Sequence, residues 1–166
     1  MPSMTPAVAA DFDGCIAGYA FPACGEPREN VVTALRCLKV NGWEIIVHSA
    51  RVNPRWPEPG RTQKVMEMLQ YLLVQRIPFA RVWGVELLSE HAGEIELLSF
   101  AFSTKDVGKP AAHLYLDDRG LVDLDPLTAD EIVQIALRRF EETEREHAES
   151  LARNGEAPTY ATANRT

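Results

Sequence analysis

Acidic residues end two apolar stretches that lie far apart in this chain. Asp11 and Asp13 occur in the sequence Asp-Phe-Asp-Gly after the apolar residues 7–10, and Asp117 and Asp118 end the sequence Leu-Tyr-Leu-Asp-Asp. Short apolar runs of this kind predict buried strands, and parallel sheets carry their chemistry at the carboxyl ends of strands. Carboxylates gathered at one edge repel one another unless a cation lies among them, and hard oxygen ligands suit Mg²⁺. The sequence therefore predicts a magnesium site.

Two further residues add a hydroxyl group and a positive charge at the same edge. Ser49 ends a second apolar run, residues 43–49, and Lys109 precedes the second acidic stretch in the sequence Gly-Lys-Pro. Phosphoryl transfer uses such a set, because its transition state spreads negative charge that a cation, a lysine and a hydroxyl group can stabilise. One aspartate can accept the phosphoryl group covalently, while a second carboxyl group moves the protons.

The ordered sequences DFDG, HSAR, GKP and YLDDR resemble the motifs of the haloacid dehalogenase (HAD) superfamily of phosphatases and phosphotransferases, over about residues 7–119. The short chain and the YAFPACGEP stretch are most similar to small members that lack a large cap domain. The resemblance implies a three-layer, Rossmann-like α/β sandwich with a mainly parallel central sheet. It also implies Mg²⁺ as the cofactor and an aspartyl-phosphate intermediate.

The resemblance assigns a role to each acidic residue. Asp11 would be the nucleophile and a Mg²⁺ ligand. Asp13 would be the general acid and base, and its backbone carbonyl would also bind the metal. Asp117 would bind the metal directly, and Asp118 would do so directly or through water.

Four other positions belong to the same comparison. Ser49 would hold a phosphoryl oxygen, and Lys109 would neutralise the intermediate. Arg51 is expected either to bind a second anionic group of the substrate, as a bidentate donor, or to form a structural ion pair. Cys15 stands where the family usually has Thr or Ser, and its thiol is a weak hydrogen-bond partner.

Aromatic residues and a histidine near these motifs have less specific interpretations. His48 alternates with Ser49 in the predicted strand and should face away from it, which favours a packing role. Tyr19, Phe21 and Trp56 lie in the two loops expected to overhang the site. There they would either cover a substrate or anchor the loops.

The elements that must position these residues follow from hydrophobic periodicity. Strands are predicted at residues 7–12, 43–49, 79–83 and 112–117, and helices at residues 29–41, at residues 62–75 and from Thr128 onward. This alternation predicts βα units around a mostly parallel sheet. Residues 86–102 are interpreted as a hairpin, with a broken helix as the alternative. Thr128 and Glu131 predict a capping box.

Composition limits the class of protein. The 166 residues predict one domain over residues 1–150, followed by a disordered tail at residues 151–166. A net charge of −7 gives little support for binding nucleic acid. Neither a signal peptide nor a membrane-spanning run is recognisable, so a cytoplasmic location is expected. Cys15, Cys24 and Cys37 show no disulfide or zinc spacing and are interpreted as free thiols.

These features together predict a Mg²⁺-dependent phosphatase that hydrolyses a small phosphomonoester. The alternative is a non-catalytic phosphate-sensing or partner-binding module on a HAD-like scaffold. A response-regulator receiver is disfavoured, because it would carry its paired acids after the first strand and its acceptor aspartate after a middle one. Here the first strand ends in Asp-x-Asp-Gly and the second ends in Ser49.

Overall fold

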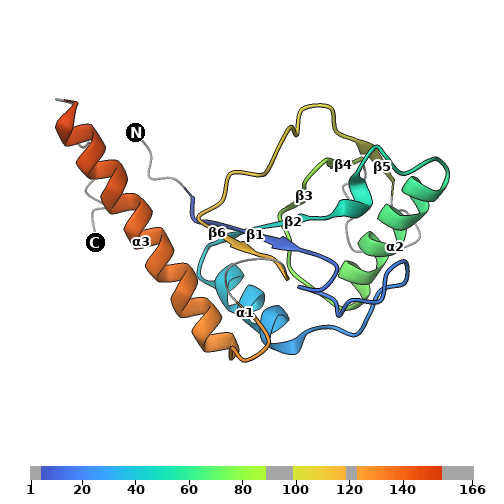
Figure 1. The fold of residues 1–166 in the computed structure, drawn as a ribbon, viewed down its shortest axis with the longest axis horizontal. Coiled ribbons are helices and arrows are strands. Elements are labelled where there is room, and N and C mark those ends of the chain that lie inside the picture. The colour runs from blue at the N-terminus through green and yellow to red at the C-terminus, as the bar shows by residue number, and fades with distance from the viewer. Residues whose placement is uncertain (1–4, 89–98, 119–122, 155–166) are drawn as a thin grey trace, which may run out of the picture.

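A computed structural model describes residues 5–88, 99–118 and 123–154 of the chain, and a mixed sheet forms their centre (Figure 1). Within these ranges the sheet has six strands in the order β5-β4-β3-β2-β1-β6. The strands are β1 (Ala7–Asp11), β2 (Glu44–His48), β3 (Arg81–Val82), β4 (Val85–Leu87), β5 (Phe100–Phe102) and β6 (Leu114–Leu116). β6, β1, β2 and β3 are parallel, whereas β4 and β5 pair antiparallel. The predicted α/β class with a mainly parallel sheet is confirmed.

Helices pack against the central strands. They are α1 (Glu29–Val40), the 3-10 helix η1 (Ala50–Val52), α2 (Gly60–Val74) and α3 (Ala129–Arg153). Apolar residues of α1, α2 and α3 form one buried cluster with Val8 and Ala10 of β1 and with Ile45 and Val47 of β2. The strands alternate, so every second side chain of β1 and β2 contributes to this core.

The opposite face of the central strands has a smaller apolar cluster. It contains Ala7, Ala9 and Ile46, packed against Trp83 and Ala112. The segment between β5 and β6 passes on this side of the sheet (Figure 1). By the same alternation, residues 11 and 48, two positions beyond Ala9 and Ile46, belong to this face.

The predicted hairpin over residues 86–102 agrees with the antiparallel pairing of β4 with β5. Residues 89–98, between these strands, lie outside the described residues. The predicted strand at residues 79–83 is shorter in the structure and covers only Arg81–Val82. No helix among the described residues is long and apolar enough to cross a membrane.

Helix α3 starts at the predicted capping box but continues further than expected. The Thr128 side chain accepts a hydrogen bond from the Glu131 amide, and the Glu131 side chain accepts one from the Thr128 amide. The helix ends at Arg153 and so includes residues 151–153 of the predicted tail. Each of those residues adds one backbone hydrogen bond to a helix that has already formed. The rest of the predicted tail, residues 155–166, lies outside the described residues.

The capping box gives a first test of how α3 is anchored. Thr128→Ala should lower the free energy of unfolding by about 1 kcal/mol, because an amide of the first turn loses its side-chain acceptor. Thr143→Ala, in the middle of the same helix, is the matched control and should leave stability unchanged or slightly higher. Urea unfolding of the two variants measures both effects, and equal stabilities would contradict a role for the cap.

Candidate functional site

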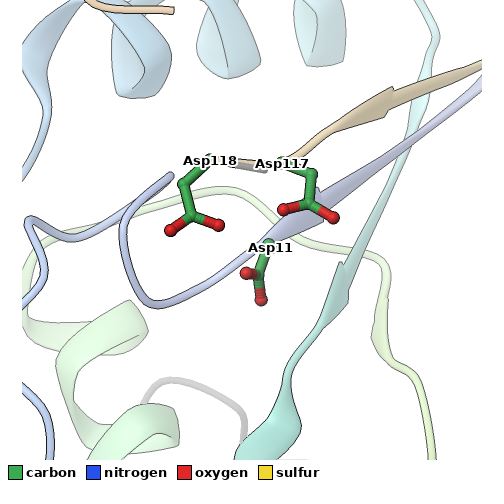
Figure 2. Close-up of side chains that lie close together, drawn as sticks. All are labelled: Asp11, Asp117 and Asp118. Atoms are coloured by element: carbon green, nitrogen blue, oxygen red, sulfur yellow. The ribbon is translucent and has the colours of Figure 1, made fainter. Parts of the chain in front are cut away.

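Asp11, Asp117 and Asp118 form an acidic cluster at one edge of the sheet. Asp11 is the last residue of β1, and the other two directly follow β6, which pairs parallel to β1. One carboxylate oxygen from each residue lies within 4.8 Å of the others. Figure 2 shows the Asp117 and Asp118 carboxylates turned toward Asp11. The predicted meeting of the two acidic strand ends is confirmed.

Burial and neighbouring charge act together on Asp11. The pKa of Asp11 is raised from 3.8 to about 7, chiefly by burial and also, in decreasing order, by the Asp117, Asp118 and Asp13 carboxylates. The hydrogen bond from the Phe12 amide to Asp11 Oδ1, 2.8 Å long, opposes this rise in pKa. The cluster therefore favours the uptake of positive charge, either as a proton or as a cation.

The donor set of the acidic cluster fits a hard divalent cation. Carboxylate oxygens are the ligands that Mg²⁺ prefers, and one or two of them with waters complete its shell. Gly14 makes room for this arrangement. It has a φ of +86°, and a Cβ atom there would lie 2.6 Å from Oδ2 of Asp118. A glycine is thus required both for the turn after β1 and for the position of Asp118.

Asp13 does not join the acidic cluster with its carboxylate. Oδ2 of Asp13 accepts a hydrogen bond of 2.8 Å from Nε of Arg51, and Oδ1 accepts one of 2.6 Å from Nη2. The metal contact predicted for Asp13 is through its backbone carbonyl and stays a prediction. What the sequence did not reveal is that a guanidinium group holds this carboxylate at both oxygens.

Arg51 lacks the exposure that its predicted substrate-binding role requires. Its side chain is 0% exposed and also donates to the backbone carbonyls of Pro22 and Ala23, at 3.0 Å and 2.8 Å. The structure therefore corrects the substrate-binding expectation in favour of its alternative, the structural ion pair. The physical reason is that η1 turns the chain directly after Ser49, which directs Arg51 into the interior.

The two overhanging loops contact each other beside this ion pair. The rings of Phe21 and Trp56 lie 5.4 Å apart, and Lys64 Nζ lies 5.0 Å from the centroid of the Trp56 ring. The Arg51 guanidinium lies 5.3 Å from the centroid of the Phe21 ring. These contacts agree with the loop-anchoring interpretation of Phe21 and Trp56, whereas Tyr19 is 69% exposed.

Ser49 and Lys109 line the same cavity. Oγ of Ser49 accepts a hydrogen bond from the Arg51 amide and so caps η1. Lys109 is exposed, with Nζ 5.5 Å from the centroid of the Tyr115 ring. His48 lines the cavity too, although Nε2 of its ring is buried.

Cys15 has the environment of an apolar core residue. Its side chain is fully buried next to the acidic cluster. Burial raises the pKa of the Cys15 thiol, and the Asp11 carboxylate raises it further. The group is therefore a neutral thiol and packs as a small apolar side chain.

Comparison with known proteins adds a relative of the same fold. No family model and no curated protein sequence matches the chain. The chain is similar to the solved structure of a conserved protein from Bacteroides thetaiotaomicron, with 22% identity and a TM-score of 0.52, over 80% of this chain and 90% of that one. At this identity the similarity shows the fold alone, and the function has to be argued from the site.

The raised pKa of Asp11 predicts how the stability of the metal-free protein depends on pH. Folded Asp11 keeps its proton up to about pH 7, whereas the unfolded carboxyl group releases it near 3.8. Folding thus takes up a proton between these values, so this contribution to the free energy of unfolding falls as pH rises from about 4 through about 7. Urea unfolding of metal-free wild type and Asp11→Asn should show the wild type losing stability relative to the variant.

Mg²⁺ provides the control for this experiment. Because binding requires ionised carboxylates, Mg²⁺ should restore the stability of the wild type above about pH 7 and should do less for Asp11→Asn. A difference between the two proteins that stays constant with pH would contradict the assignment of the shift to Asp11.

The buried ion pair predicts a large effect on stability. Arg51→Met should lower the free energy of unfolding by roughly 3–5 kcal/mol, because Asp13 is left without its cation. Arg55→Met, an exposed arginine in the adjacent loop, is the matched control and should change stability by less than about 0.5 kcal/mol. Thermal and urea unfolding measure both, and similar stabilities of the two variants would contradict the structural role of Arg51.

Proposed function

We propose that this protein is a Mg²⁺-dependent phosphatase of HAD type, which hydrolyses a small phosphomonoester through an aspartyl-phosphate intermediate. The observation that carries the proposal is the acidic cluster, in which Asp11 lies within 4.8 Å of two further carboxylates. The order of the motifs and the α/β fold are consistent with it. When bound, Mg²⁺ would neutralise the carboxylates and the phosphoryl oxygens.

Asp11 and Asp13 have different roles in the proposed reaction. An Asp11 carboxylate oxygen attacks phosphorus, and the bond to the leaving oxygen breaks as that oxygen takes a proton from Asp13. Water then attacks the phosphorus of the aspartyl phosphate while Asp13 accepts its proton. This releases inorganic phosphate and regenerates the Asp11 carboxylate. Ser49 and Lys109 hold the phosphoryl oxygens during both steps.

The ion pair with Arg51 imposes a condition on Asp13. Both carboxylate oxygens accept hydrogen bonds from the guanidinium, but each oxygen has a second lone pair available to a substrate or a water. Arg51 thus sets the orientation in which Asp13 meets the leaving oxygen. Asp13 has to loosen one of these hydrogen bonds when it carries the proton.

A non-catalytic phosphate-sensing or partner-binding module is the second candidate. The observation that favours it is the same ion pair, because a carboxylate held by a buried guanidinium is poorly placed to exchange protons. Such a module would bind phosphate and Mg²⁺ at the acidic cluster without turnover.

Asp11 supplies the decisive variant. Wild type should hydrolyse phenyl phosphate and members of a panel of metabolite phosphates only when Mg²⁺ is present. Asp11→Asn should reduce the rate by more than about a thousandfold, because the covalent acceptor is lost. Phosphate release is the measurement, and Asp130→Asn, an exposed acid in the first turn of α3, is the matched control.

The outcomes separate the two candidates. Turnover retained in Asp11→Asn would remove Asp11 as the nucleophile. Absence of turnover in the wild type, together with Mg²⁺-dependent binding of inorganic phosphate measured by calorimetry, would replace the phosphatase by the binding module.

A further inference from the structure

A cavity of about 590 Å³ is lined by His48, the register partner of Asp11 of the acidic cluster. This volume is far larger than a phosphoryl group needs and falls within the range of about 300–1,000 Å³ that small-molecule sites occupy. It is lined by residues that follow β2, by the turn between β3 and β4, and by the segment between β5 and β6. A ligand larger than phosphate therefore has room next to Ser49 and Lys109.

The sheet places the cavity next to Asp11. His48 is the register partner of Asp11 on the neighbouring strand, and it lines the cavity. Nε2 of His48 is buried, and no hydrogen-bond partner for it lies within the described ranges. His48 therefore borders both the end of β1 and the cavity. A phosphomonoester held at Asp11 would extend its leaving group past His48.

One part of the cavity wall combines an aromatic ring with a cation. The Arg61 guanidinium stacks on the Phe102 ring, 3.5 Å from its centroid, and Nε of Arg61 donates to the Val52 carbonyl. Its two terminal nitrogens have no hydrogen bond or ion pair to any residue that the structure describes. Arg61 is thus held rigidly while four N–H groups are left for a ligand.

Another part of the cavity wall is held by hydrogen bonds to the backbone. Nε1 of Trp83 donates to the Gly108 carbonyl at 2.8 Å, and the Gly84 amide donates to Asp106 Oδ2 at 3.0 Å. Asp106 is the acid that lines the cavity, and this hydrogen bond engages one of its oxygens. The described lining of the cavity therefore includes apolar rings, two cationic side chains and one carboxylate, of which one oxygen already accepts a hydrogen bond.

From this arrangement we infer that the cavity is a leaving-group site for phosphomonoesters whose alcohol carries a second anionic group on an apolar body, with Arg61 as the residue that binds that group. The inference rests on the proposed function for the position of the phosphoryl group. Planar guanidinium groups bind carboxylates with two parallel hydrogen bonds, and stacking on Phe102 fixes the plane in which they can form. Aromatic bodies suit the walls formed by Trp83 and Phe102.

Two matched substrates test the inference. 4-Carboxyphenyl phosphate and phenyl phosphate share the aromatic body and differ in the second anionic group. Wild type should have the lower KM for the carboxylated ester. Arg61→Gln should raise that KM by roughly tenfold or more while leaving kcat and the KM for phenyl phosphate within about twofold, because a hydrogen-bonded charge pair is lost. Arg61→Lys should fall between the two.

Arg55→Gln is the matched control, since Arg55 is exposed in the loop before α2 and does not line the cavity. Thermal unfolding of each variant separates loss of binding from loss of fold, and Arg61→Lys keeps the test valid if Arg61→Gln unfolds. Equal KM values for the two esters in the wild type, or the same ratio of KM values in Arg61→Gln, would overturn the inference.

The experiment also distinguishes this failure from failure of the proposed function. If neither ester is hydrolysed, the phosphatase proposal fails, and binding of the two esters to wild type and Arg61→Gln is then compared by calorimetry. Tighter binding of 4-carboxyphenyl phosphate that depends on Arg61 would support the cavity assignment by itself. Equal binding of the two esters would overturn it.

Discussion

Repulsion among carboxylates is the constraint on which this site depends. β1 and β6 are adjacent and parallel, and because both end in acidic residues, their pairing brings three carboxylates within 4.8 Å of one another. Burial makes the charged form of Asp11 still less favourable. A proton relieves the repulsion but removes the negative charge that a nucleophile needs. A divalent cation relieves it and keeps that charge, so under the proposed function the cluster, which could hold a metal ion, would bind a cation rather than a proton.

The ion pair with Arg51 reduces the contribution of Asp13 to the repulsion among the carboxylates. Asp13 is two residues from Asp11, yet it contributes the smallest of the three carboxylate effects on the pKa of Asp11. Its charge is balanced by a guanidinium that is itself excluded from solvent. The same guanidinium binds the carbonyls of Pro22 and Ala23, so the charge balance of the site and the path of the loop after β1 are coupled.

The elements near the acidic cluster were predictable because a buried strand and the end of an element each produce a recognisable pattern among neighbouring residues. The apolar run before Asp11 and the capping box at Thr128 each involve residues close together in the sequence, and both predictions agree with the structure. The ion pair between Asp13 and Arg51 spans 38 residues, and the stacking of Arg61 on Phe102 joins α2 to β5. These contacts between distant segments depend on how the loops turn after β1 and β2. Hydrophobic periodicity carries no information about the direction of those turns.

The two faces of the sheet explain where specificity can reside. Helices α1, α2 and α3 cover the face that carries Val8 and Ala10, and their side chains fill it with a continuous core. Residues 11 and 48 belong to the other face, where Trp83 and the segment between β5 and β6 provide the cover and leave a cavity. A coil tied to the sheet by a few backbone hydrogen bonds tolerates substitution better than a packed helix does. Under the proposed function, the ends of β1 and β6 would fix the chemistry, and the cavity would determine which phosphate ester is accepted.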